Sequence, residues 1–150
     1  MTAAKYMAVQ GAAMIVGAGF ILVGILGFIP GVTTDFDHLD WAGHHSGAML
    51  FGVFAVSGLH NVMHLALGVL GLAMARTYAA ARAYFLGGGL LYLGLWVYGI
   101  VIDGGSSANF MPFNAADNWL HFGLGAGMVL LGVTLAGQHD PTKRRAKVRT

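Results

Sequence analysis

The sequence of 150 residues contains no cysteine and very few charged residues. The missing thiols exclude disulfide bonds, iron–sulfur clusters, thiolate metal sites and cysteine nucleophiles, and they leave the redox compartment open. Only 9% of the residues are charged while 57% are hydrophobic, and the mean hydropathy is +0.69. Soluble domains carry about 25% charged residues. The composition therefore predicts an integral membrane protein that is small enough to be one domain.

The sequence also lacks the motifs of the common enzyme classes. It shows no Ser–His–Asp arrangement, no phosphate-cradling loop and no nucleotide fingerprint. No set of nucleophile, base and orienting residue can be proposed from it. The net charge of +2 does not indicate nucleic-acid binding. An enzyme is therefore the least favoured class, and the expected surroundings are a lipid bilayer without nucleic acid.

Long apolar runs predict four membrane spans in a single domain over residues 1–137. The first run, from Met7 to Ile29, carries no charge and is longer than the apolar region of a signal peptide, so we expect it to be retained. About 20 helical residues cross the apolar core of a bilayer. The spans are expected at about residues 7–29, 55–75, 83–102 and 118–137, followed by a basic tail at 138–150.

Charges of opposite sign flank opposite ends of these spans. All acidic residues except Asp140 fall in or beside the loops 30–47 and 103–117. Basic residues in short loops stay in the cytoplasm. We therefore expect a multi-pass protein of the cell membrane with both termini cytoplasmic and these two loops outside. The basic residues that set this orientation are Lys5, Arg76, Arg82 and those of the tail, Lys143, Arg144, Arg145, Lys147 and Arg149.

A short polar phrase occurs twice within the apolar sequence. The segments 60–68 (HNVMHLALG) and 117–125 (DNWLHFGLG) share Asn, His, Leu and Gly at the same spacing, with Asp117 in place of His60. Residues 19–24 match 89–94 more weakly. Each copy of the repeat would contain two spans, so the two copies would have the same orientation in the membrane. They would be related by a pseudo-two-fold axis along the membrane normal. We therefore predict an all-α four-helix bundle of two tandem helical hairpins, a parallel internal repeat.

The polar side chains of this phrase form the candidate site. Positions i and i+4 share a helix face, so His60 is expected beside His64 and Asp117 beside His121. If the second and fourth spans face each other, three imidazoles and one carboxylate converge in the outer half of the bundle. Zinc and similar metals accept that set of ligands. The four residues are therefore a candidate site for a divalent metal.

Packing is the interpretation that the sequence favours for the same residues. Asn61 and Asn118 are expected to pair across the pseudo-axis, and Asp117 to accept a hydrogen bond from a histidine. Interhelical polar pairs in membranes average about 0.6 kcal/mol, so they specify packing more than they stabilise it. Gly68 and Gly125 would allow close approach of the helices.

Two further chemistries stay open for these side chains. His64 and His121 could supply the axial ligands of a haem, although no Lys or Arg flanks the outer face to pair with the propionates. Histidine and aspartate inside a membrane are also the titrating groups that a small proton-linked transporter needs.

The first outer loop is a second, weaker candidate site. Residues 35–45 are rich in Asp and His, which bind hard or borderline metals. A solvated loop with Trp41 at the membrane interface is the favoured interpretation. His44 is a weaker metal candidate because it could fold inward and join the membrane cluster. Methionines at helical positions are interpreted as packing residues and not as copper ligands.

Five stretches of the sequence carry a resemblance to a known family. They are IPGVTT at 29–34, AGH with Ser46 at 42–46, AMLFG at 48–52, LHNVMHL at 59–65 and NAADNWLH at 114–121. Over residues 10–137 the chain resembles bacterial four-span membrane proteins labelled domain of unknown function 4383. The resemblance implies a four-helix membrane protein and no activity, because the family has none assigned. Its pattern includes His44, His60, Asn61, His64, Asp117, Asn118 and His121, whereas His38 and His45 stand at variable positions.

Together these observations predict a non-enzymatic structural or accessory membrane subunit of unassigned activity. Its outer-half His/Asp/Asn cluster packs the bundle and is the candidate metal site. A chain with little mass outside the membrane is expected to form homo-oligomers or to join a larger membrane complex through a glycine-lined helix face. The alternative is a haem- or metal-dependent redox protein, or a proton-linked transporter.

Overall fold

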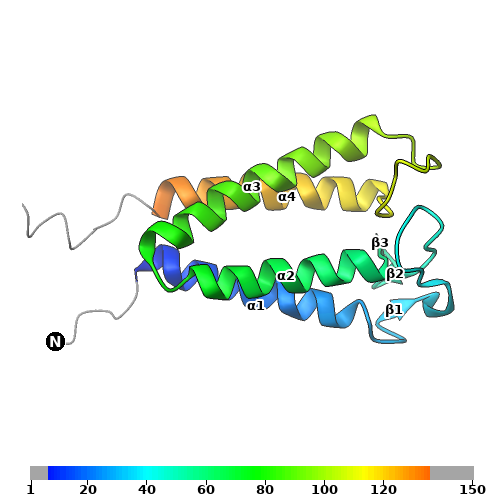
Figure 1. The fold of residues 1–150 in the computed structure, drawn as a ribbon, viewed down its shortest axis with the longest axis horizontal. Helices are drawn as coiled ribbons and strands as arrows, with labels where there is room; N and C mark the ends of the chain where they lie inside the picture. The colour runs from blue at the N-terminus through cyan, green and yellow to red at the C-terminus, as the bar shows by residue number, and fades with distance from the viewer. Residues whose placement is uncertain (1–6, 136–150) are drawn as a thin grey trace, which may run out of the picture.

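The computed structural model describes residues 7–135, and the helices of this part run back and forth along one axis (Figure 1). The chain is all-α, as predicted, apart from three very short strands. Three helix starts differ from the predicted spans by several residues, since the second helix begins at Gly58, the third at Tyr78 and the fourth at Ala115. The helices are α1 (Ala8–Leu26), α2 (Gly58–Met74), α3 (Tyr78–Val101) and α4 (Ala115–Thr134).

Polar residues determine where the last three helices begin. The Ser57 hydroxyl accepts a hydrogen bond from the backbone N–H of His60, and the Thr77 hydroxyl accepts one from Ala80. The Asn114 side chain accepts one from Asp117 N–H. Such caps satisfy backbone donors that have no partner within the helix.

The helices pack as two antiparallel pairs. Hairpin one is α1 against α2, and hairpin two is α3 against α4. Glycines make the close contacts: a Cβ added at Gly17 would lie 2.8 Å from the carbonyl oxygen of Gly68, and one at Gly89 would lie 2.9 Å from that of Gly125. Both distances are too short for a real side chain, so each hairpin depends on backbone approaching backbone.

These contacts correct the predicted alignment of residues 19–24 with 89–94. Gly19 and Gly94 both face open space, so neither position marks an equivalent helix contact. Gly17 and Gly89 instead occupy matching places opposite Gly68 and Gly125. Because glycines are frequent in α1 and α3, the predicted alignment, which paired Gly19 with Gly89, also matched glycine with glycine although it was displaced by two residues.

A cap of residues 30–57 covers the end of hairpin one, where the sequence predicted a solvated loop and the start of a span. It contains three antiparallel strands in the order β1–β2–β3, and its residues Ala48, Leu50 and Val56 are buried against Val23 and Leu26 near the end of α1. A turn at Phe51 and Gly52, both with positive φ, joins the last two strands. Its elements are β1 (Thr33–Thr34), a 3-10 turn (Phe36–His38), β2 (Met49–Leu50) and β3 (Phe54–Ala55).

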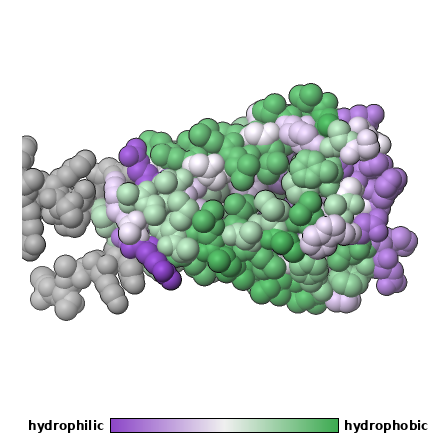
Figure 2. Space-filling model, viewed as in Figure 1, coloured by the Kyte–Doolittle hydropathy of each residue, from purple (hydrophilic) through white to green (hydrophobic). Residues whose placement is uncertain are grey.

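The outer surface of the helices is apolar, and polar residues gather at the two ends of the molecule (Figure 2). Ile15 is 76% exposed, Leu90 65% and Leu130 62%, on three different helices. By length and composition, α1 and α3 are apolar enough to cross a membrane, and α2 is a shorter apolar helix. Residues 7 and 135, the first and last described, lie together at the end opposite the cap (Figure 1).

We predict that Gly68→Ala destabilises hairpin one by about 1–3 kcal/mol, because the new methyl group would lie 2.6 Å from the Gly17 carbonyl oxygen. Gly123→Ala is the matched control, since nothing lies within 4 Å of a Cβ there. It should be neutral or slightly stabilising. Thermal unfolding in detergent measures both. Equal melting temperatures for the two variants would contradict the close contact.

Candidate functional site

The three histidines of the repeated phrase come together between the hairpins, and we call them the histidine cluster. His60 and His64, one turn apart on α2, stack with ring centroids 4.7 Å apart. The ring of His121 on α4 lies 6.1 Å from that of His60. All three are buried. The i, i+4 spacing on α2 and the packing of the two hairpins thus place three imidazoles in one region.

Two aromatic residues join the histidine cluster, so that five side-chain rings contact one another in a closed series. Phe20 of α1 stacks on His64 at 5.8 Å and lies 5.6 Å from Tyr92 of α3, with their planes 4° apart. Tyr92 in turn lies 5.5 Å from His121. Neither Phe20 nor Tyr92 was predicted to belong to the candidate site. Their shared place, three residues after Gly17 and Gly89, is the signal that could have revealed them.

Asp117 does not join the histidine cluster as predicted. Its Oδ2 accepts hydrogen bonds from the backbone N–H groups of Ala55 and Asn114, both at 3.0 Å. Among residues 7–135 no hydrogen bond joins it to a histidine, so the predicted Asp–His bond is wrong. The physical reason is its place in the first turn of α4, where backbone N–H groups and the helix dipole attract a carboxylate.

Ala55 connects the two copies of the polar phrase. Its N–H donates to Asp117, and its carbonyl oxygen lies 3.2 Å from Nδ1 of His60. Because a carbonyl can only accept, the proton of this imidazole is on Nδ1 and the lone pair is on Nε2. The first residue of each copy therefore binds the backbone of the same residue in β3.

The predicted pair between Asn61 and Asn118 is not formed. The Asn118 Nδ2 donates to the Gly99 carbonyl oxygen at 3.0 Å, within hairpin two. The Asn61 side chain is buried against Gly27, where a Cβ would come within 2.0 Å of its Oδ1. Each asparagine thus faces a glycine of its own hairpin, because that glycine leaves room for an amide group.

Two cavities border the histidine cluster. One of about 280 Å³ lies between α2, α3 and the segment 110–113, and one of about 210 Å³ lies under the cap. The cluster lines both, whereas Asp117 lines only the second.

The predicted metal ligands are near one another but do not form a coordination site. In the described part of the chain, no three His, Asp or Glu side chains are placed to hold one ion. The reason is that Asp117 and His60 form hydrogen bonds to the backbone, which hold these two side chains away from a shared ligand position. His44 lies in the cap with its ring centroid 3.9 Å from that of His45, and it lines neither cavity. Haem ligation by His64 and His121 stays a prediction.

The fold and the cluster define a class: a small all-α protein with an apolar exterior and two helices long enough to cross a membrane. Within that class, the family model described as a domain of unknown function (DUF4383) matches residues 10–134, so the chain belongs to this family. The match confirms the family that the sequence resembles. No curated protein matches the chain. No solved structure matches it either.

We predict that Asp117→Ala lowers the free energy of unfolding by about 1–3 kcal/mol, because two partly buried backbone N–H groups lose their acceptor. Asp117→Asn should cost less, since both bonds go to one oxygen that an amide can replace. Asp37→Ala, at an exposed position of the cap, is the control. Chemical or thermal unfolding in detergent gives the ranking. If Asp117→Asn lowered the stability as much as Asp117→Ala, the negative charge of the carboxylate, and not its role as a hydrogen-bond acceptor, would be essential.

Proposed function

We propose that the chain is a four-span integral membrane protein with both termini and the turn at residues 75–77 in the cytoplasm. The helices of the described part contain between 17 and 24 residues, which suits the apolar core of a bilayer. Their exposed apolar side chains would face lipid (Figure 2). The cap and the segment 102–114 lie together at one end and carry acidic residues, whereas Arg76 and Arg82 lie near the other.

Within this protein, His60 and Asp117 act with the cap as a structural clamp that holds the two hairpins together, and not as a catalytic centre. The observation that carries this proposal is that His60 and Asp117 both bind the backbone of Ala55. Two more bonds join the hairpins at the same end: Asn114 Nδ2 to the Val53 carbonyl oxygen and Gly43 N–H to the Phe110 carbonyl oxygen, both at 2.7 Å. They lie where α3 has diverged from α2 (Figure 1).

The clamp supports the proposal of a parallel internal repeat. Gly27 faces Asn61 as Gly99 faces Asn118. Phe20 contacts His64 as Tyr92 contacts His121. These matched pairs fit a pseudo-two-fold axis between the hairpins, with the Phe20–Tyr92 stack close to it.

We further propose that the protein is an accessory subunit that associates with copies of itself or with a larger membrane complex. On α4, a Cβ at Gly123 or Gly127 would meet nothing within 4 Å, and Trp119 one turn earlier is 68% exposed. Glycines four residues apart on an open helix face favour helix association in membranes.

Single cysteines introduced into this cysteine-free chain test the orientation. We expect an impermeant maleimide to label Ser107→Cys in intact cells, because Ser107 is exposed in the segment 102–114. Ala79→Cys, exposed at the opposite end, should react only after permeabilisation. Labelling of both positions from outside would contradict the four-span topology.

Crosslinking and native electrophoresis in mild detergent test the association. We expect oligomers for the unaltered chain and their loss in Gly123→Leu, because a leucine blocks the close approach of a second helix. Gly94→Leu, at an equally open position on α3, is the control and should still associate. A monomer in every case would overturn the proposed self-association.

A further inference from the structure

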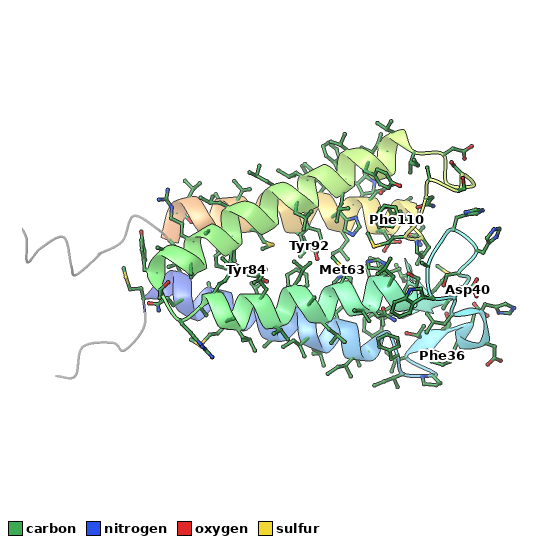
Figure 3. The ribbon with its side chains drawn as sticks, viewed as in Figure 1. Phe36, Asp40, Met63, Tyr84, Tyr92 and Phe110 are labelled. Carbon is green, nitrogen blue, oxygen red and sulfur yellow. The ribbon has the colours of Figure 1, made fainter. Side chains whose placement is uncertain are left out.

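The cavity between the hairpins is open at the side of the bundle. Its rim includes Met63 of α2, which is 41% exposed, and Leu91 of α3, which is 45% exposed. Figure 3 shows Met63, Tyr84 and Tyr92 in the space between these two helices. In the proposed four-span topology this opening faces lipid, so a ligand would reach it from within the bilayer.

The cavity continues along the bundle as a groove. A second cavity of about 220 Å³ shares Leu67 and Leu91 with the first and reaches Met74 and Tyr84 near the cytoplasmic end. Together the two reach the size of pockets that hold small organic ligands, for which the usual range is roughly 300–1,000 Å³. We call the part at the histidine cluster the chamber and the apolar part that continues from Leu67 and Leu91 the extension.

The three histidines are the polar residues in the wall of the chamber. His64 is 7% exposed and His121 is 2% exposed, and the Nδ1 atom of each is sealed from the chamber, so Nε2 is the ring nitrogen of each that is left to meet a ligand. Buried polar groups normally have a partner, and those that lack one call for an explanation. His60 contributes an Nε2 lone pair, because its Nδ1–H is bound to Ala55. The chamber therefore offers both donors and an acceptor within an otherwise apolar lining.

Flat aromatic walls restrict what fits between these groups. Phe113 meets His121 edge to face at 4.9 Å, and Tyr92 lies beside the same imidazole. Aromatic side chains pack well against planar rings. The occupant should thus be planar, should carry oxygens that hydrogen-bond to imidazole, and should continue into an apolar chain.

We propose that this groove binds an isoprenoid quinone, with its ring at the histidine cluster and its chain along α2 and α3. The ring carbonyl oxygens accept hydrogen bonds from the imidazole N–H groups of His64 and His121. The hydroxyl of a reduced ring can donate to Nε2 of His60. The chain lies against Leu67 and Leu91 and reaches Gly87.

Calorimetric titration of the purified full-length chain in mild detergent tests this assignment. The probes are ubiquinone-2, the same ring without a chain (ubiquinone-0), and geraniol, which is the chain without a ring. We expect one saturable site for ubiquinone-2. His64→Leu and His121→Leu should each weaken it about fivefold to tenfold, as expected for the loss of one hydrogen bond.

Other variants distinguish the contribution of the quinone ring from that of its chain, and a loss of binding from a loss of folding. Gly87→Leu should weaken ubiquinone-2 and leave ubiquinone-0 unchanged, because Gly87 lines the extension and has open space for a side chain. His121→Gln keeps an N–H donor and should retain most of the affinity. His44→Leu and Gly94→Leu, outside both cavities, should bind as the unaltered chain does.

Three results would overturn the proposal: no saturable binding of ubiquinone-2, equal affinity in all variants, or binding of geraniol without binding of ubiquinone-0. The last result would assign the groove to a lipid chain. The maleimide labelling is independent of these titrations, so failure of the quinone site and failure of the four-span topology are distinguishable.

Discussion

The backbone of Ala55 is the point on which the arrangement of the two hairpins depends. Its N–H binds Asp117 of α4, and its carbonyl oxygen binds His60 of α2. In an apolar bundle, burial of a side-chain polar group costs free energy unless the group finds a partner, and here the extended strand β3 supplies a donor to Asp117 and an acceptor to His60. The cap thereby links two hairpins whose helices also pack on each other through Phe20 against Tyr92 and through Tyr84 against Gly71.

Local and periodic features of this molecule could be predicted from the sequence. Helix spacing placed His60 beside His64, and the repeated phrase placed His121 near them. The binding partner of Asp117 could not be predicted, because Ala55 is far away in the sequence and lies in a strand of two residues, too short to leave a periodic pattern. The asparagine pair was wrong because glycines at 27 and 99 accept an amide within each hairpin.

The clamp at the cap end and the opening between α2 and α3 result from one arrangement of the helices. Backbone contacts at glycines draw α1 to α2 and α3 to α4, whereas α2 and α3 diverge toward the cap (Figure 1). The space that this leaves is bounded by the histidine cluster on the inside and by exposed apolar side chains at the rim. Clamp and groove are therefore two consequences of one arrangement, and the histidines take part in both.

Amide hydrogen exchange of Ala55, followed by NMR on the labelled protein in micelles, tests the clamp most directly. An amide held by a buried carboxylate exchanges only when that structure opens. The account predicts strong protection of Ala55 in the unaltered chain and its loss in Asp117→Ala, while amides in the middle of α1 stay protected. Exchange of Ala55 as fast as that of the exposed loop amide of Ser107, or protection that survives Asp117→Ala, would contradict it.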